Sequence, residues 1–187
     1  MRVWLFGALS ALLVAGPLAA AGTAGWSFAR TDSSLEFSGR YEDIELSGSC
    51  REFKVQLEFD DNGKPGLLRV LVNTNSIEMN DSDINQELRK QDWFNTAVNG
   101  QASYESSSIE RSDDGNFIAS GILNLKGSSH PVDVPFAWQQ QGAEASVRGE
   151  LQLLRLQWNI GIGEWADTSL IADEVEVRFQ VRLERND

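Results

Sequence analysis

A strict alternation of apolar and polar side chains limits the folds open to this sequence more than any other feature. In residues 173–184 every second side chain is apolar, from Val175 to Leu183, and the side chains between them are charged or polar. Successive side chains of a β-strand point to opposite faces of a sheet. The period of two therefore predicts a strand with one buried face and one solvated face.

The same alternation recurs along the chain. It is found in residues 53–59, 117–125, 132–138 and 145–153, and a shorter run begins at Leu35. Residues 67–72 are also strand-like, but they are apolar on both faces, so the pattern does not assign their register.

The segments between these runs carry turn residues. Residues 60–63 and 113–116 contain Asp, Asn and Gly, and residues 126–129 contain Lys, Gly and Ser. Such residues tolerate the positive φ angles of hairpin turns. Strands joined by short turns predict antiparallel pairing within one domain.

One segment departs from the period of two. Residues 81–94 read as a short helix, with Asp81 or Ser82 available as N-cap. Ile84 and Leu88 are four positions apart and share one face of that helix. A single helix in such a chain is expected to flank or plug the end of a barrel.

Because one helix cannot cover several apolar strand faces, the sheet must cover itself as a barrel or a sandwich. Closure removes exposed strand edges, so we expect an all-β fold: a single antiparallel barrel of about eight strands. The interior of such a barrel is either filled by side chains or holds one small ligand. Ala119, Gly121, Ala145 and Gly149 fall on the predicted inward faces, and their small size suggests room inside.

The N-terminus predicts export. Arg2 is followed by an apolar run over residues 3–14 and then by small residues up to position 24. This order matches a secretory signal peptide, with cleavage after Ala21 or Ala24. The run is shorter than the about 20 residues of a membrane-spanning helix. We therefore expect residues 1–24 to be a signal peptide, residues 25–187 the domain, and the periplasm, or secretion, the destination.

Charge and cysteine content limit the partners. With 16 Lys and Arg against 28 Asp and Glu, the net charge is −12, which argues against binding to nucleic acid or to anionic lipid surfaces. No later segment is long and apolar enough to cross a membrane. Cys50 is the sole cysteine, so no internal disulfide is expected, and a buried thiol is its predicted role.

No catalytic or metal-binding residues emerge. His130 is the sole histidine and precedes a proline in a predicted turn, and nothing places it beside Cys50 as a base for a nucleophile. Asp81 and Asp83 lack the Gly and Glu of a calcium loop, and an N-cap explains them better. Nucleotide-binding, hydrolase and zinc motifs are missing from the sequence. We expect neither an enzyme nor a resident cofactor.

Motifs along the chain resemble the YceI-like family of bacterial periplasmic, lipocalin-like polyisoprenoid-binding proteins. They lie at residues 33–37, 73–77, 88–95, 102–106, 121–132 and 159–168. The last block is similar to a subgroup found beside b-type membrane cytochromes. The sequence departs from the family at Arg40-Tyr41, where many members carry a His, and at Asn99-Gly100, where Tyr-Pro is common.

The resemblance implies a lipocalin-like barrel that holds one isoprenoid tail, such as a quinone or polyprenyl lipid, and a b-type membrane cytochrome as a partner. The expected binding wall consists of inward positions chosen by periodicity. They are Phe37, Val55, Leu57, Phe117, Leu123, Val134, Phe136, Val177, Phe179 and Val181.

Two other function classes stay open. One is an interaction module with a filled barrel, which would act through the cytochrome or an envelope protein. The other is a hydrolase or isomerase of the same lipids, for which no nucleophile and base can be named.

Overall fold

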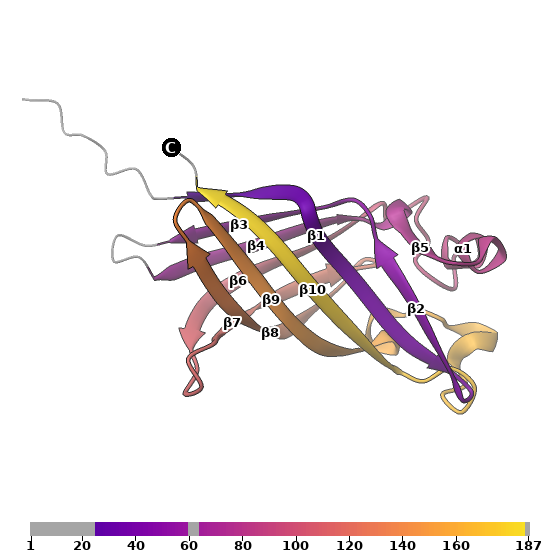
Figure 1. Ribbon diagram of the computed structural model, residues 1–187. Helices are drawn as coiled ribbons and strands as arrows, with labels where there is room; N and C mark the ends of the chain where they lie inside the picture. The colour runs from indigo at the N-terminus through magenta and orange to yellow at the C-terminus, as the bar shows by residue number, and fades with distance from the viewer. Residues whose placement is uncertain (1–24, 60–63, 186–187) are drawn as a thin grey trace, which may run out of the picture.

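The computed structural model describes residues 25–59 and 64–185 (Figure 1). The predicted signal peptide and the loop at residues 60–63 lie outside these ranges. The strands are β1 (Gly25–Tyr41), β2 (Ile44–Cys50), β3 (Phe53–Phe59), β4 (Pro65–Asn73), β5 (Ile77–Met79), β6 (Gln101–Arg111), β7 (Phe117–Leu125), β8 (Ser128–Gln141), β9 (Glu144–Leu154) and β10 (Glu174–Arg185). The helical segments are α1 (Ser82–Leu88) and the 3-10 turns η1 (Thr74–Ser76), η2 (Arg155–Trp158) and η3 (Gly163–Ala166).

The sheet closes on itself. Its order is β10-β9-β8-β7-β6-β4-β3-β1-β2-β5, and β10 also pairs with β1. The ring therefore runs through β1, β3, β4, β6, β7, β8, β9 and β10, and its strand pairs are antiparallel. This confirms the predicted antiparallel barrel, and β2 and β5 extend it at one end.

The extension arises because β1 changes partner along its length. Gly25–Ser27 pair with β3, whereas residues 36–41 pair with β2. Between them the pairing with β10 shifts register after Ala29, where Asp32 has a φ of 65°. A bulge of this kind bends a strand, and Figure 1 shows the long β1 running from one end of the barrel to the other.

One half of the barrel is packed solid. Trp26 lies against Trp138 and Phe59, with ring centroids 5.2 and 6.3 Å apart. Leu57 and Leu183 are 0% exposed. Burial of apolar area is the main driving force for folding, so this half is the barrel's hydrophobic core.

The small inward residues do not create room, contrary to the expectation from sequence. Ala119 and Ala145 are buried in the packed core. A Cβ added to Gly121 would lie 2.2 Å from the carbonyl oxygen of Glu105. One added to Gly149 would lie 2.2 Å from the carbonyl oxygen of Pro135 and 2.4 Å from the Phe179 ring. These glycines let neighbouring strands and a large ring approach closely.

Helix α1 begins where predicted and ends earlier. The Asp81 side chain accepts hydrogen bonds from the backbone N–H groups of Asp83 (2.8 Å) and Ile84 (3.0 Å), which confirms it as the N-cap. The helix ends at Leu88 rather than at residue 94. Beyond it the chain forms turns, in which the N–H of Phe94 donates to the carbonyl oxygen of Leu88 at 3.0 Å. Figure 1 shows α1 at one end of the barrel, as expected.

No helix or strand was predicted for the segment between β9 and β10, although residues 159–168 carry one of the family motifs. It contains η2 and η3 and lies at the same end of the barrel as α1 (Figure 1). Among the helices within residues 25–59 and 64–185, none has the length and apolar character that spanning a membrane requires.

Candidate functional site

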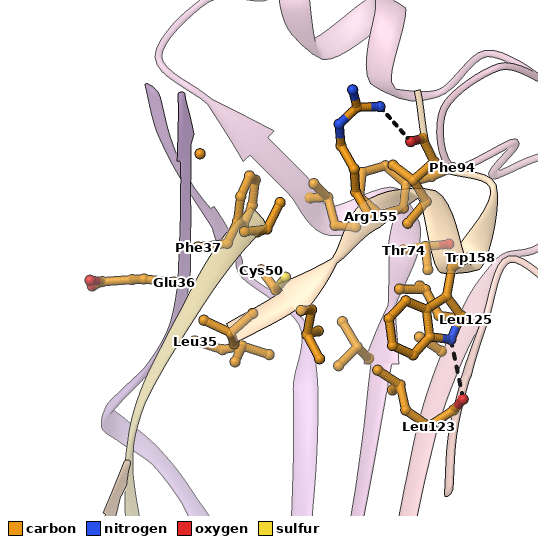
Figure 2. A pocket seen from close by; sticks show the side chains of 18 of the residues that line it. Leu35, Glu36, Phe37, Cys50, Thr74, Phe94, Leu123, Leu125, Arg155 and Trp158 are labelled. Carbon is orange, nitrogen blue, oxygen red and sulfur yellow. Dashed lines mark hydrogen bonds between the residues drawn. The ribbon is translucent and has the colours of Figure 1, made fainter. Parts of the chain in front are cut away.

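The half of the barrel nearest to α1 is hollow. It encloses a cavity of about 640 Å³, which is within the range of small-molecule sites, about 300–1,000 Å³. Inward positions from strands on every side of the ring form its wall, and α1 contributes Ile84 and Leu88. Figure 2 shows Leu35 and Phe37 directed into the cavity, whereas Glu36 points away from it.

A single layer of side chains separates the hollow half from the packed half. Val55, Val134, Val147 and Val181 line the cavity. The next inward position on each of the same strands belongs to the packed core, as Leu57, Phe136, Ala145 and Leu183 do. The cavity therefore has a closed inner end, which we call the floor and define by these four valines.

The cavity opens at the other end. Tyr41, at the end of β1, lines it and yet remains exposed. Tyr41 forms an isolated β-bridge with Ile171, and the N–H of Glu42 donates to the carbonyl oxygen of Leu170 at 2.6 Å. These contacts join the β1–β2 turn to the segment before β10, and together they border the mouth.

Most of the wall positions that periodicity selected do line the cavity. They are Phe37, Val55, Leu123, Val134, Val177, Phe179 and Val181.

Leu57, Phe117 and Phe136 do not line the cavity, and their predicted place on its wall is wrong. All three face inward, but they belong to the packed half, where Phe117 and Phe136 stack with centroids 5.5 Å apart. Alternation identifies the inner face of a strand, but it does not show where along the strand the interior changes from filled to hollow.

Arg155 organises the segment between β9 and β10, which borders the open end of the cavity. It is 4% exposed, and its five N–H groups donate to five backbone carbonyl oxygens over 2.6–3.0 Å. The accepting residues are Ile160, Gly161, Trp165, Ile171 and Ala172. A buried guanidinium satisfied in this way holds the whole segment between β9 and β10 in place.

Burial lowers the pKa of Arg155, and the nearby carboxylate of Asp173 partly offsets this. Arg155 is not among the predicted site residues, although the sequence carries a signal for it. The alternating inward series of β9 includes Leu151 and Leu153, and Arg155 is its next member. A charged residue that continues an inward apolar series is a candidate for a buried organising role.

Lys126 ties a second loop to the same end. It begins the β7–β8 turn with a φ of 47°, in the turn that the sequence predicted. Its Nζ donates to the carbonyl oxygen of Asp92 at 3.1 Å and to that of Asn159. Burial lowers its pKa, and the Asp92 charge opposes that shift.

Polar groups on the wall are largely satisfied by the protein itself. The Tyr104 hydroxyl donates to the carbonyl oxygen of Ala119 at 2.7 Å, and burial followed by the Asp133 charge raises its pKa to about 12. Thr74 Oγ1 donates to the carbonyl oxygen of Asn99 at 2.5 Å. Trp158 Nε1 donates to that of Leu123 at 3.3 Å (Figure 2). The cavity consequently presents an almost wholly apolar surface.

Cys50 and His130 are not brought together. Cys50 lines the cavity, and burial raises the pKa of its thiol to about 12, so the thiol is a poor nucleophile at neutral pH. His130 lies in β8 rather than in a turn, where its ring meets Trp158 edge-on at 5.1 Å. Within the part of the chain that the structure describes, no cluster of three His, Cys, Asp or Glu residues could hold a metal ion.

Known structures share this architecture. BcnA of Burkholderia cenocepacia matches with a TM-score of 0.78 and 28% identity, over 83% of this chain and 98% of that one. A polyisoprenoid binding domain from Saccharophagus degradans, implicated in plant cell wall breakdown, matches with a TM-score of 0.69 and 17% identity, over 87% of this chain and 99% of that one. At 17% identity the second likeness concerns the fold alone.

Proteins with similar sequences belong to the same family as the similar structures. A UPF0312 protein of Yersinia pestis is 33% identical over 98 residues, which is 52% of this chain and 50% of the relative. Protein YceI of Escherichia coli is 28% identical over 127 residues, or 62% of this chain and 66% of the relative. The chain thus spans about half the length of the Yersinia relative. The model of the YceI-like domain matches residues 26–183, which confirms the resemblance, and this chain belongs to the YceI-like domain family.

Proposed function

We propose that this protein is a carrier or sequestering protein that holds one polyisoprenoid lipid in the cavity and acts by binding rather than by catalysis. One observation carries the proposal: the barrel is packed solid in one half and hollow, apolar and closed at its inner end in the other. When an apolar chain enters such a site, its surface is removed from water on all sides. Each Å² of apolar area buried in this way contributes about 25 cal/mol to the free energy of binding.

The chemistry of the wall supports an isoprenoid tail over a fatty acid. A carboxylate deep in the cavity would need a cation, and an unpaired buried charge is costly. Arg155 is the buried cation beside the cavity among the described residues, and its N–H groups are all engaged by backbone carbonyls. Arg40 also lines the cavity, but it is exposed and so does not supply a cation deep inside. The similar Saccharophagus domain is described as polyisoprenoid binding, which agrees in kind with this choice.

The same cavity favours a carrier over an interaction module with a filled barrel. We place the carrier in the periplasm, on the strength of the predicted signal peptide. A b-type membrane cytochrome is the partner we propose for it, because an isoprenoid quinone would be a ligand that such a cytochrome can reduce or oxidise.

Native mass spectrometry of the exported protein, purified without detergent, tests the proposal. We expect an adduct that organic extraction releases as an isoprenoid lipid, in about one copy per chain. A cavity variant, Val177→Glu, serves as the matched control and should carry no adduct while staying folded. Recovery of only unliganded protein, which also fails to take up added isoprenoids, would refute the carrier function.

A further inference from the structure

Half of strand β2 has no neighbouring strand on one of its edges. On the other edge, β2 pairs with β1 along residues 44–49. On this edge β5 pairs with residues 48–50 alone. Within the part of the chain that the structure describes, no strand lies beside the same edge at residues 44–47. We call residues 44–47 the open edge.

Backbone polar groups of the open edge point outward at alternate residues. Tyr41 and Ile44 pair across a two-residue turn, so they exchange hydrogen bonds with each other. In an antiparallel ladder such pairs alternate with pairs whose N–H and C=O groups face away from each other. The N–H groups of Glu45 and Ser47 therefore face the open edge.

The neighbouring edge of β5 is covered, in contrast to the open edge. The side chain of Asn85 in α1 accepts a hydrogen bond from the N–H of Met79 at 2.7 Å and donates to its carbonyl oxygen at 2.9 Å. One amide side chain thus takes the place of a further strand. Proteins commonly cover strand edges because an uncovered edge can pair with another chain, and the described residues supply no such cover at residues 44–47.

A polar hollow of about 410 Å³ lies on the outer face of the sheet beside the open edge. Glu36, which points away from the lipid cavity in Figure 2, is one of the residues that line it. The carboxylates of the hollow belong to Glu36, Glu45, Glu78 and Glu176. Glu78 pairs with Arg51 and Glu176 pairs with Arg178, whereas no ion pair among the described residues reaches Glu36 or Glu45.

Arginines near the hollow do not cancel its negative charge. Arg40 lies opposite Glu45 in the register of β1 and β2, and it lines the mouth of the lipid cavity rather than the hollow. The turn before the open edge adds Glu42 and Asp43. Six carboxylates therefore stand against the three guanidinium groups of Arg40, Arg51 and Arg178. This surface favours a partner of positive charge.

We infer that the open edge is a docking site for a basic, extended segment of another protein, which adds a strand beside β2. Strand addition uses the backbone groups of the edge for affinity and the alternating side chains for specificity. On the outer face, Lys or Arg side chains of the partner meet Glu45 and the hollow. On the opposite face, its apolar side chains lie beside Ile44, which is 58% exposed, and Leu46. The partner segment consequently alternates basic and apolar residues.

A second copy of this chain is a poorer occupant of the open edge. Two copies joined along this edge would bring their Glu45 side chains and acidic hollows together, and like charges on neighbouring strands destabilise pairing. The net charge of −12 adds to that repulsion. Because the docking surface lies outside the lipid cavity, the inference goes beyond the carrier function and does not depend on it.

The probe is a synthetic peptide, blocked at both ends, that alternates lysine and valine over about six residues, an ordinary strand length. We expect it to bind wild-type protein in NMR titrations and to slow hydrogen exchange at the N–H groups of Glu45 and Ser47. The same peptide with every backbone amide N-methylated keeps its charges but cannot donate to a strand edge. We expect that peptide to bind about tenfold more weakly, the worth of one or two hydrogen bonds.

Two variants separate the contribution of charge from that of the backbone. Glu45→Gln should weaken binding of the lysine–valine peptide about two- to fivefold, as expected for one exposed ion pair. Glu110→Gln makes the same change at an exposed position of β6, and as the matched control it should leave the affinity unchanged. Ser47→Pro removes an outward N–H without touching the ladder to β1, and it should abolish the protection of Glu45. Thermal unfolding of each variant reports whether the barrel is intact.

Three results would overturn the inference and leave the carrier function standing. The first is no binding of the lysine–valine peptide, and the second is equal affinity for the N-methylated peptide. The third is a concentration-dependent dimer of wild-type protein in analytical ultracentrifugation that Ser47→Pro abolishes, which would assign the open edge to a second copy of this chain.

Discussion

Val55 and Leu57 lie two positions apart on the inner face of β3, yet Val55 lines the cavity and Leu57 is 0% exposed in the packed core. The boundary between the hollow and the filled half of the barrel passes between these two side chains. It crosses β10 in the same way, between Val181 and Leu183. This boundary sets the depth of the cavity, and the first of the following predictions tests it directly.

Removing part of the layer beneath the floor should deepen the cavity. In Leu57→Ala the lost side chain leaves a void next to Val55, and we expect a destabilisation of about 2–5 kcal/mol, together with a shift of preference toward longer isoprenoids. Urea unfolding and binding of a series of isoprenoid lengths would measure both. A variant that loses stability without any change in length preference would show that the void stays separate from the cavity.

A charge on the wall should abolish binding. Val177 lines the cavity, and an ionised carboxylate there would be costly to bury beside an apolar ligand. We expect Val177→Glu to lose isoprenoid binding, whereas Gln180→Glu, which adds the same charge on the exposed face of β10, retains it. Thermal unfolding must accompany the titrations. Equal affinities in the two variants would place the ligand outside the barrel.

The inward glycines should not tolerate a side chain. At Gly121 an added Cβ would lie 2.2 Å from the carbonyl oxygen of Glu105 and 2.6 Å from the Cα of Ser106. Both are backbone atoms, so they cannot move aside without distorting β6. Overpacking typically costs about 1–3 kcal/mol, and we expect Gly121→Ala to destabilise the protein by at least that much. At Gly100 an added Cβ would meet only ordinary contacts at 3.6 Å, so Gly100→Ala is the control for denaturant unfolding. Equal stability of the two variants would contradict the close strand approach at Gly121.

Loss of the Arg155 guanidinium should release the segment between β9 and β10. Arg155→Met leaves five backbone carbonyls without their donor, and we expect a loss of about 3 kcal/mol or more. Hydrogen exchange should then accelerate in residues 160–172 more than in β6. Arg178→Met removes an exposed guanidinium from β10 and should change stability by about 0.5 kcal/mol or less. Unchanged exchange in residues 160–172 would mean that other contacts hold the segment.

Cys50 should make stability fall at alkaline pH. Burial raises the pKa of its thiol from 9.0 to about 12, so above pH 9 the unfolded chain loses this proton while the folded chain keeps it. The free energy of unfolding is therefore unaffected by this thiol below pH 9. Between pH 9 and 12 it falls by about 1.4 kcal/mol per pH unit. The slope of unfolding free energy against pH should be smaller in Cys50→Ala. Identical slopes for the two proteins would show that the thiol ionises equally well in both states.

Several elements were predictable because local rules decide them. The alternation in β3, β7, β8, β9 and β10 reflects a buried and a solvated face, and Asp81 caps α1 through its own backbone neighbours. The pattern could not show which side chains of residues 67–72 face the interior. In the structure Leu68, Val70 and Val72 face inward, and Leu71 is exposed on the outer face, because pairing with β3 and β6 sets the register of β4.

The amino-acid sequence alone determined the strand pattern, the antiparallel class, the capped start of the helix and the inner face of each strand, because these depend on side-chain period and turn chemistry. Tertiary structure alone decided where the interior is hollow. That depends on how large residues such as Trp26 and Trp138 meet across the barrel and on how the chain after Arg155 folds back over its end. Both bring together residues far apart in the sequence, and a local period carries no information about such contacts.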